Sequence, residues 1–345
     1  MAEENVWLSL IIGNTRLHWG FFRDGQLIST WHTPHLHQPD MELIANGQFQ
    51  GDAWQALAEA TPQNSRPASL ISSLPSPLPN PLASPLPEQP LSPSQLWIAS
   101  AVPSQTSQWL EAAGGARVVH NSHVPIEGLY GTLGCDRAIN LLGAGNAVGW
   151  PVLVIDAGTA LTFTAAIKTS QGSASFYGGA ILPGVRLQRQ ALGERTAALA
   201  NALSLSQSIF ESSCESATDL PDRWGTDTSD AIASGLVYSL ISTITDYLYD
   251  WWRRFPKGKV IMTGGDSPRL YALMLQALSQ GHGLPRQHMA QQQRTPEIIS
   301  RVQADCTVDT HLMFWGMRAY RQGILDQSAA SRTARNTTDS TTAKS

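Results

Sequence analysis

Two stretches of the chain share one pattern: LIIGNT at residues 10–15 and IDAGTA at residues 155–160. In each, an apolar run stops at a glycine, a threonine follows within two positions, and a second extended run begins. Glycine lets a backbone turn tightly and approach a ligand without a Cβ in the way, and the N–H groups and hydroxyl of such a turn can hold phosphate oxygens. The pattern predicts two related halves that face one nucleotide.

The composition is that of a soluble protein large enough for two lobes. The 345 residues carry a net charge of −4, which gives no general attraction to nucleic acid or to an anionic membrane. The three cysteines are odd in number and widely spaced, so neither a disulfide framework nor a zinc pattern is expected. The first residues lack the basic stretch of a signal peptide, and polar residues interrupt the most apolar long segment, 236–255, so we expect a cytoplasmic protein without a membrane span.

Apolar runs and turn residues alternate along the chain. Strands are expected over residues 6–12, 16–22, 95–103, 117–119, 152–155, 161–167, 178–184 and 259–263, and helices over 41–60, 104–113, 133–147, 185–199, 230–255 and 310–325. Residues 62–93 hold 10 of the 21 prolines and are expected to form an extended surface insertion, and the tail 327–345 lacks an apolar period and is expected to be disordered. The strand–helix–strand rhythm indicates an α/β fold with an N-terminal lobe at 1–147 and a C-terminal lobe at 148–326.

The second glycine turn carries a carboxylate that the first one lacks. Asp156 ends a buried-type strand two residues before Gly158, where it can hold a cation at phosphate oxygens, and Thr159 can hydrogen-bond those oxygens. The first turn has Ile11 at the position that matches Asp156. The alternative is that Asp156 only caps a hairpin turn, as Asp commonly does before glycine.

A third glycine pair follows another buried-type strand, in the stretch TGGD at residues 263–266. Gly264 and Gly265 would let a flat adenine or ribose lie against the backbone, and the helix that follows favours negative charge at its start. The alternative is an ordinary tight turn from strand to helix.

An acid and a base stand side by side in Gly134-Cys135-Asp136-Arg137, at the start of an expected helix. Asp136 can accept a proton from an attacking hydroxyl, and Arg137 can bind a substrate carboxylate through two hydrogen bonds. An Asp in a first helical turn beside a surface Arg is the alternative. Cys135 has no context that would lower its pKa, and we expect it to pack rather than to react.

Two further patterns are not expected to carry chemistry. The histidines in HTPHLH, residues 32–37, lie on a polar stretch without a supporting carboxylate, so a metal site is not predicted there. The glycines in GAGNAVG, residues 143–149, precede a strand where a dinucleotide-binding fingerprint would follow one.

Taken together, the motifs resemble those of type III pantothenate kinase, a member of the acetate kinase/sugar kinase/Hsp70/actin-like superfamily. The resemblance rests on five motifs in the family's order: IIGNT (11–15), GCDR (134–137), DAGTALT (156–162), GGAILPG (178–184) and MTGG (262–265). It implies a two-lobed ribonuclease H-like (actin-like ATPase) fold with a nucleotide cleft between the lobes. It also implies transfer of the ATP γ-phosphoryl group to pantothenate, the first step of coenzyme A biosynthesis, by a homodimer.

The resemblance also implies roles for individual residues. Asp136 would accept the proton of the pantothenate hydroxyl, Gly134, Cys135, Asp136 and Arg137 would line the pantothenate pocket, and Asp156 would bind a monovalent cation, potassium or ammonium. The stretch TSDAIASG at 228–235 resembles the family segment whose leading threonine contacts pantothenate, which nominates Thr228. Mg²⁺ is expected beside the phosphates. The ATP-binding residues are expected to be Ile11, Ile12, Gly13, Asn14, Thr15, Arg16, Leu17, His18, Thr159, Gly264 and Gly265.

The chain departs from the family pattern at three positions. Ile11 stands where the family has Asp, His18 stands where it has Lys, and Glu127 stands where it has a pocket Tyr. Tyr130 lies close in sequence and is expected to take the place of that Tyr.

Two other functions stay open at this point. A non-catalytic regulatory homologue that binds nucleotide or pantothenate would explain Ile11 and His18, whereas the intact Asp136, Arg137, Asp156 and Thr159 favour the enzyme. A kinase for another small alcohol would follow from a rebuilt pocket near Glu127 and Tyr130. No nucleic-acid or membrane partner is expected.

Overall fold

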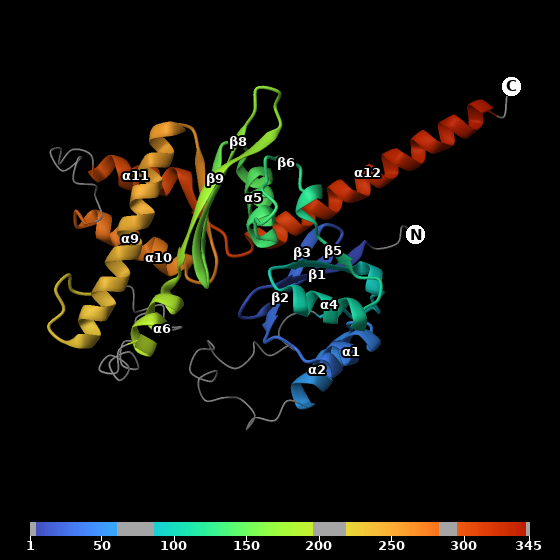
Figure 1. The fold of residues 1–345 in the computed structure, drawn as a ribbon, viewed down its shortest axis with the longest axis horizontal. Helices are drawn as coiled ribbons and strands as arrows, with labels where there is room; N and C mark the ends of the chain where they lie inside the picture. Colours follow the sequence, from blue (N-terminus) through green and yellow to red (C-terminus); the bar gives the residue numbers. More distant parts are fainter. Residues whose placement is uncertain (1–4, 61–85, 196–218, 283–294, 343–345) are drawn as a thin grey trace. The chain divides into compact units, whose positions relative to one another are not determined.

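The computed structural model of the chain describes residues 5–60, 86–195, 219–282 and 295–342 (Figure 1). These residues form two compact units. Unit 1 contains residues 5–60, 86–147 and 312–342, and unit 2 contains residues 148–195, 219–282 and 295–311. The units meet between Ala147 and Val148, and the last helix of the chain belongs to unit 1.

The sheet of unit 1 begins with a meander of three antiparallel strands. These are β1 (Val6–Ile12), β2 (Leu17–Arg23) and β3 (Gln26–Thr33), and β4 (Leu96–Ser100) and β5 (Arg117–Val118) then extend the sheet in parallel on the other side of β1. The strand order is β3-β2-β1-β4-β5. Unit 1 also contains the short strand β6 (Ile126–Glu127) and the 3-10 turns η3 (Pro93–Gln95) and η4 (Asn121–His123).

The sheet of unit 2 repeats this plan. The antiparallel strands β7 (Val152–Ala157), β8 (Ala160–Lys168) and β9 (Ala174–Pro183) are followed by β10 (Lys259–Thr263) and β11 (Cys306–Val308), which run parallel to β7. Within the unit the order is β9-β8-β7-β10-β11, which matches that of unit 1 strand for strand. This order is that of a ribonuclease H-like domain, so the fold is a duplicated α/β unit, as expected. The two glycine turns occupy the same place in both copies, between the first and second strands.

One face of the unit 1 sheet is covered by helices α1 (Gln38–Asn46), α2 (Gly51–Ala60) and α4 (Pro103–Ala112) (Figure 1). The core between them is centred on Trp19, whose ring centroid lies 4.9 Å from that of Trp54 and 5.2 Å from that of Trp109. Edge-on packing of large aromatic rings buries apolar area and adds a directional preference. This cluster holds the sheet and its helices together.

The other face of that sheet receives the last helix of the chain, α12 (Leu312–Thr342). A Cβ on Gly20 of β2 would lie 2.7 Å from the ring of Phe314, so the helix approaches the strand closely. Helix α5 (Cys135–Val148) packs against α12 through two glycines, because a Cβ on Gly143 would lie 2.6 Å from the carbonyl oxygen of Leu312 and a Cβ on Gly316 would lie 2.0 Å from that of Ile139. Gly143 therefore serves a helix–helix contact.

In unit 2 the sheet packs against α9 (Thr228–Arg254), α10 (Ser267–Ser279) and α11 (Thr295–Asp305), and α6 (Val185–Arg195) follows β9 (Figure 1). Helix α9 is long and apolar enough to cross a membrane, yet 61% of its most apolar window is buried inside the protein. Its apolar residues, Val237, Ile241, Ile244 and Leu248, belong to the core of the unit. The length and apolar composition of α9 are therefore those of a helix that is buried in the core.

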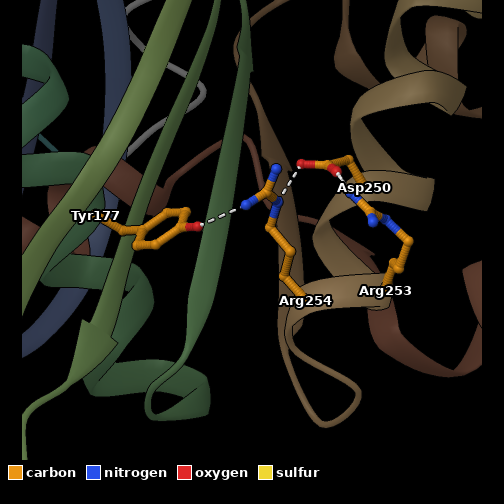
Figure 2. A network of polar contacts seen from close by, with 4 residues as sticks. All are labelled: Tyr177, Asp250, Arg253 and Arg254. Atoms are coloured by element: carbon orange, nitrogen blue, oxygen red, sulfur yellow. Dashed lines mark hydrogen bonds and ion pairs between the residues drawn. The ribbon is translucent and has the colours of Figure 1, made fainter.

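The end of α9 is joined to β9 by a small polar network, which Figure 2 shows. Arg253 and Arg254 donate hydrogen bonds to Asp250, with nitrogen–oxygen distances of 2.6 Å and 2.7 Å, and Arg254 donates to the hydroxyl of Tyr177 at 3.3 Å. The hydrogen bond from Arg253 and, next in size, that from Arg254 hold the pKa of Asp250 below its ordinary value. The side chains are exposed, so the network orients the end of the helix and adds little stability.

The structure differs from the sequence prediction in the helix expected over 41–60. The chain forms two helices there, because Gln48 and Phe49 have positive φ angles of 53° and 58° between α1 and α2. Such angles cost free energy for residues with a Cβ. The burial of the Phe49 ring, with no exposed surface, offsets that cost.

Two other differences concern the ends of expected segments. Residues 86–92, expected as part of the surface insertion, include Leu91, which is buried in the unit 1 core; most of the expected insertion lies outside the described residues. The tail 327–345, expected to be disordered, continues α12 as far as Thr342. A helix that is already nucleated by packed turns extends at low cost per residue, even without an apolar face.

Candidate functional site

The second glycine turn holds Asp156 between two glycines. Asp156 is at the end of β7 and pairs with Thr162 of β8 on one side and Thr263 of β10 on the other. A Cβ on Gly264 would lie 2.5 Å from Oδ1 of Asp156, and a Cβ on Gly158 would lie 3.5 Å from the same oxygen. Any side chain at Gly264 would displace the carboxylate, so the glycine is required by the carboxylate's position.

Two other glycine-containing segments of the chain meet this turn: the start of α10 and the residue after β9. The N–H of Asp266 donates to the carbonyl of Ala157 at 3.0 Å, which brings the start of α10 to the end of β7. The N–H of Gly184 donates to the carbonyl of Thr159 at 3.0 Å, and a Cβ on Gly184 would lie 2.2 Å from the carbonyl oxygen of Gly158. Gly265 is exposed and no atom lies within 4 Å of its Cβ position, so its backbone surface is uncovered.

The predicted site residues of the first turn divide into buried and exposed positions. The side chains of Ile11, Ile12 and Leu17 are buried in unit 1, so only their backbone can reach a ligand. Asn14 and Thr15 are exposed at the tip. The turn is closed by the N–H of Gly13, which donates to the carbonyl of Arg16 at 3.1 Å.

His18 stands beside this turn on β2 and carries no charge at neutral pH. Burial lowers the pKa of His18 to about 3, and the electrostatic effects of His32 and Arg16 act in the same direction. The rings of His18 and His32 pack edge to face with centroids 4.6 Å apart. At position 18 the family that the sequence resembles has a lysine, whose charge is permanent. This chain therefore has a neutral imidazole at that position.

The predicted catalytic loop lies in unit 1, at the start of α5. Oδ1 of Asp136 accepts a hydrogen bond from the N–H of Arg137 at 2.9 Å, and the carboxylate folds over Gly134, whose Cβ would lie 2.3 Å from the same oxygen. The side chain is partly buried. The helix start and the neighbouring glycine thus fix the direction of a carboxylate that is still reachable.

Arg137 and Tyr130 form a pair across this loop. The guanidinium donates to the hydroxyl of Tyr130 at 3.0 Å; Arg137 is 6% exposed, whereas Tyr130 is 43% exposed. A buried Arg whose direction is fixed by a partner is suited to bidentate recognition of a carboxylate. Tyr130, which the sequence nominated in place of the family's pocket Tyr, thus contacts the loop 134–137 through Arg137.

Cys135, which lies between them in the sequence, is poorly suited to act as a nucleophile. Burial raises the pKa of the Cys135 thiol to about 11, so the thiolate that reacts is scarce at neutral pH. The neighbouring charge of Asp136 acts in the same direction.

A cavity of about 630 Å³ that is widely open to solvent lies in unit 1 against this loop. Its walls come from the carboxyl ends of the parallel strands β4 and β5, from the first turn of α4, and from residues 131–135. The lining residues are Ser100, Ala101, Pro103, Thr106, Ser107, Val118, Val119, His120, Asn121, Gly131, Thr132, Leu133, Gly134 and Cys135. A cavity of this volume with a mixture of apolar and polar walls suits a small polar molecule.

Three lining residues, Ser100, His120 and Asn121, are candidate binding residues that were not predicted from the sequence. The signal was available, because each residue ends or follows a strand that runs parallel to β1, and ligands in open α/β sheets bind outside the carboxyl ends of such strands. The strand over 117–119 was expected, but its pairing partner could not be read from the sequence.

The remaining predicted residue, Thr228, is in unit 2. It is the first residue of α9 and is exposed, directly after the N-cap Asp227, whose carboxylate accepts the N–H of Asp230 at 2.9 Å. The predicted residues thus divide between the units: the first turn, Tyr130 and the 134–137 loop in unit 1, and Asp156, Thr159, Thr228 and the glycine pair in unit 2.

The residues at the second turn are suited to a cation that is coordinated partly by the protein and partly by a bound substrate. Asp156 offers a hard carboxylate oxygen whose position is fixed by Gly264 and Gly158. Among the described residues, no three His, Cys, Asp or Glu side chains gather closely enough to hold a metal by themselves. Further ligands would have to come from backbone oxygens, water or a phosphate, as is usual for cations in phosphoryl-transfer sites.

Known proteins are similar in sequence to this chain over most of its length. The sequence model of "Type III pantothenate kinase" matches residues 76–250. A type III pantothenate kinase of Nostoc sp. is 38% identical over 322 residues, which cover 93% of this chain and 96% of that protein. One from Synechocystis sp. is 30% identical and covers 93% of this chain and 92% of that protein.

Among solved structures, the chain is similar to a ROK family glucokinase from Streptomyces griseus, with a TM-score of 0.41 and 11% identity over 91% of this chain and 97% of that one. It is also similar to MreB 5 of Spiroplasma citri, with a TM-score of 0.41 and 9% identity over 94% of this chain and 98% of that one. The family model and the extent of the sequence matches decide the assignment. The chain belongs to the type III pantothenate kinase family.

Proposed function

We propose that this protein transfers the γ-phosphoryl group of ATP to the primary hydroxyl of pantothenate, the first step of coenzyme A biosynthesis. Family membership supports the reaction. The observation that carries the assignment of residues is the 630 Å³ cavity bounded by the loop that holds Asp136. The lining reaches Gly134 and Cys135, which directly precede Asp136 in the chain. We therefore place the acceptor hydroxyl at that end of the cavity, where the partly buried carboxylate of Asp136 would accept its proton.

Asp136 acts in this proposal as the base. Its Oδ1 is held by the N–H of Arg137, which leaves Oδ2 to accept the proton of the acceptor hydroxyl. Arg137, whose direction is set by Tyr130, binds the pantothenate carboxylate, and Thr228 contributes a hydroxyl from unit 2. Gly134 and Cys135 supply wall and backbone.

ATP is held in this proposal by the two glycine turns. Residues 11–18 contact the phosphates through backbone N–H groups and the exposed Asn14 and Thr15, while Thr159 contacts them from unit 2. Gly264 and Gly265 leave backbone surface for the nucleoside. Phosphoryl transfer depends mainly on positioning and on neutralising charge on the phosphate oxygens.

Two cations complete the proposal. Asp156 would hold a monovalent cation, K⁺ or NH₄⁺, and Mg²⁺ would be bound through the ATP phosphates. When bound, the cations neutralise negative charge on the phosphate oxygens. Because the first turn has Ile11 and a neutral His18, Asp156 is the predicted residue that brings a cation to this site.

The test is an assay of ADP release by the purified protein with ATP, Mg²⁺ and K⁺, with and without pantothenate. We expect pantothenate-dependent ADP release that Asp136→Asn abolishes, whereas Asp246→Asn, at an exposed position of α9, leaves the rate unchanged. Binding of pantothenate without turnover would identify a regulatory homologue, which the neutral His18 favours, and turnover with another alcohol alone would reassign the substrate.

The cation role has its own comparison within that assay. Replacing Na⁺ by K⁺ should raise the rate of the unaltered protein, and Asp156→Asn should remove the difference between the two ions. An equal rate in both ions would contradict the role given to Asp156.

A homodimer in the cytoplasm is part of the same proposal. Family resemblance supports the dimer, and mass measurement by light scattering on the purified protein tests it. A monomer that turns over at the full rate would contradict the dimer.

A further inference from the structure

The tip of the first glycine turn is contacted from outside its own hairpin. His35 lies in the segment between β3 and α1, 22 residues after Gly13, and its Nε2 is 2.7 Å from the carbonyl oxygen of Gly13. A carbonyl oxygen only accepts hydrogen bonds, so Nε2 must be the protonated nitrogen of this ring. The distance is at the short end of the range for N–H···O hydrogen bonds.

The backbone on both sides of His35 is anchored in unit 1. Thr33 accepts a hydrogen bond from the indole nitrogen of the buried Trp19 at 3.1 Å, and the side chain of Leu36 belongs to the core. Pro34 restricts the chain between them. The imidazole of His35 therefore projects from a fixed backbone, and little conformational entropy is lost when it holds the turn.

The other histidines of the HTPHLH stretch have different roles. His32 packs on the ring of His18, and His37 is the exposed N-cap of α1 without a side-chain hydrogen bond to the helix. Among the described residues no group of three potential ligands could hold a metal. His35 is the member of this stretch that contacts the turn.

The contact fixes the direction of a backbone N–H. In a trans peptide the C=O of one residue and the N–H of the next point in opposite directions, and the peptide unit is planar. When His35 holds the carbonyl of Gly13, the N–H of Asn14 is turned away from His35. Gly13 is a residue whose dihedral angles would otherwise vary widely, so an external restraint has most effect there.

We propose that His35 is a positioning residue that holds the Gly13–Asn14 peptide in the orientation that binds the nucleotide phosphates. The inference rests on the proposed role of residues 11–18 in ATP binding. A donor that is oriented before the ligand arrives does not lose free energy to reorganisation when the phosphates bind. Loss of His35 should therefore weaken nucleotide binding without affecting the acceptor.

The experiment compares His35→Ala, His35→Gln and the control His37→Ala with the unaltered protein. The amide nitrogen of Gln reaches about as far as Nε2 of His, so Gln can restore the hydrogen bond. The dissociation constant for the non-hydrolysable ATP analogue AMPPNP with Mg²⁺ is measured by calorimetry, the KM values for ATP and pantothenate by the ADP assay, and the unfolding temperature by circular dichroism.

We expect His35→Ala to raise the AMPPNP dissociation constant and the KM for ATP about tenfold, the effect of losing one good hydrogen bond. The KM for pantothenate should change by less than about twofold, and His35→Gln should recover most of the binding. His37→Ala should behave like the unaltered protein. Equal nucleotide affinity in the His35→Ala variant, or equal losses for ATP and pantothenate, would overturn the proposal.

The same measurements separate this inference from the proposed function. If the protein binds AMPPNP but releases no ADP with pantothenate, the proposed function fails while the dissociation constants still decide the role of His35. If it binds no nucleotide at all, both fail.

Discussion

The side chain of Asp136 occupies the space that a Cβ on Gly134 would need. With only 2.3 Å between that Cβ position and Oδ1, an alanine at 134 must push the carboxylate aside. The glycine two residues before the base is thus explained by the orientation of the base and not by a special backbone angle. The loop keeps its backbone geometry if the carboxylate moves.

The variant Gly134→Ala should therefore lose activity and keep its stability. We expect kcat/KM for pantothenate to fall by about a hundredfold, since a displacement of about 1 Å in a catalytic group has effects of that size. The unfolding temperature should stay within about 2 °C of that of the unaltered protein. Gly114→Ala is the matched control, because Gly114 is exposed outside the cavity and the nearest atom to its Cβ position is the carbonyl oxygen of Leu110, at an ordinary contact distance of 3.9 Å. Equal activity of the two variants would contradict the argument.

Protonation of His18, which lies beside the first turn, makes the stability of the folded protein depend on pH. Its pKa is about 3 in the folded chain and about 6.5 in the unfolded chain, so the unfolded state binds more protons at pH values between these limits. Stability is complete above the unfolded pKa and is lost as pH falls below it. At pH 5 the loss attributable to His18 is about 2 kcal/mol.

The variant His18→Phe keeps a ring beside His32 and removes the titration. Urea unfolding at pH 7 and pH 5 should show that the unaltered protein loses about 2 kcal/mol more than the variant between the two values. An identical pH dependence in both proteins would mean that His18 protonates without cost in the folded state.

At the scale of elements, the closest approach described is that of α5 to α12. Gly143 and Gly316 bring two helix backbones together, and neither tolerates a Cβ without movement of the partner helix. Backbone atoms lie on both sides of this contact, so no flexible side chain can give way.

We expect Gly316→Ala to lower the free energy of unfolding of unit 1 by about 2–4 kcal/mol, as over-packing against a rigid neighbour does. Gly323→Ala in the same helix is the control, because its Cβ position is open, and helix propensity should make it neutral or stabilising by up to about 1 kcal/mol. Urea unfolding measured on both variants decides the matter. A loss of the same size in both would contradict the role given to the contact between α5 and α12.

The sequence predicted elements best where the pattern is local. The glycine turns and their flanking strands followed from apolar runs broken by turn residues, and β1, β2, β7 and β8 lie within a few residues of the expected ranges. The break between α1 and α2 was missed, because it depends on Phe49 reaching the core from a positive φ angle. Strand β11 was missed because its three residues are too few to show a period.

For the candidate site, the sequence identified residue types but not their distant partners. Asp136, Arg137 and Asp156 could be nominated from their neighbours in the chain. The contact of His35 with Gly13 could not, because it depends on the pairing of β2 with β3 and on the path from Thr33 to α1. The cavity beside Gly134 depends in the same way on which strands run parallel.

At the scale of the whole molecule, unit 1 is closed by the end of the chain. Leu312, Phe314, Met317 and Tyr320 of α12 are buried, the hydroxyl of Tyr320 accepts the N–H of His120 at 3.2 Å, and Arg321 donates to Asn5 at 2.8 Å. The described side chains after Gln327 are exposed. The first part of α12 therefore belongs to the core of unit 1, and the N-terminal strands do not form that core without it.

Two truncations separate these parts of the helix. Removal of residues 327–345 should leave the unfolding temperature within about 2 °C, because the described side chains of this segment, those of 327–331, are exposed and contribute little. Removal of residues 312–345 takes away four large buried apolar side chains and uncovers the surface that they cover, a loss of roughly 6–12 kcal/mol, comparable to the whole stability of a domain. The tryptophan cluster of unit 1 should then lose its near-ultraviolet circular dichroism. Retention of that signal would contradict the dependence on α12.

The closure of unit 1 by α12 also has a consequence for synthesis on the ribosome. The sheet and helices of unit 1 emerge first, but the helix that completes their core emerges roughly 165 residues later, a delay on the order of ten seconds. Throughout that interval the face of β2 that contains Gly20 lacks the helix that covers it in the finished protein. Unit 2 can fold as it emerges, whereas the nascent unit 1 must wait with apolar surface exposed, which is the condition in which a chaperone binds.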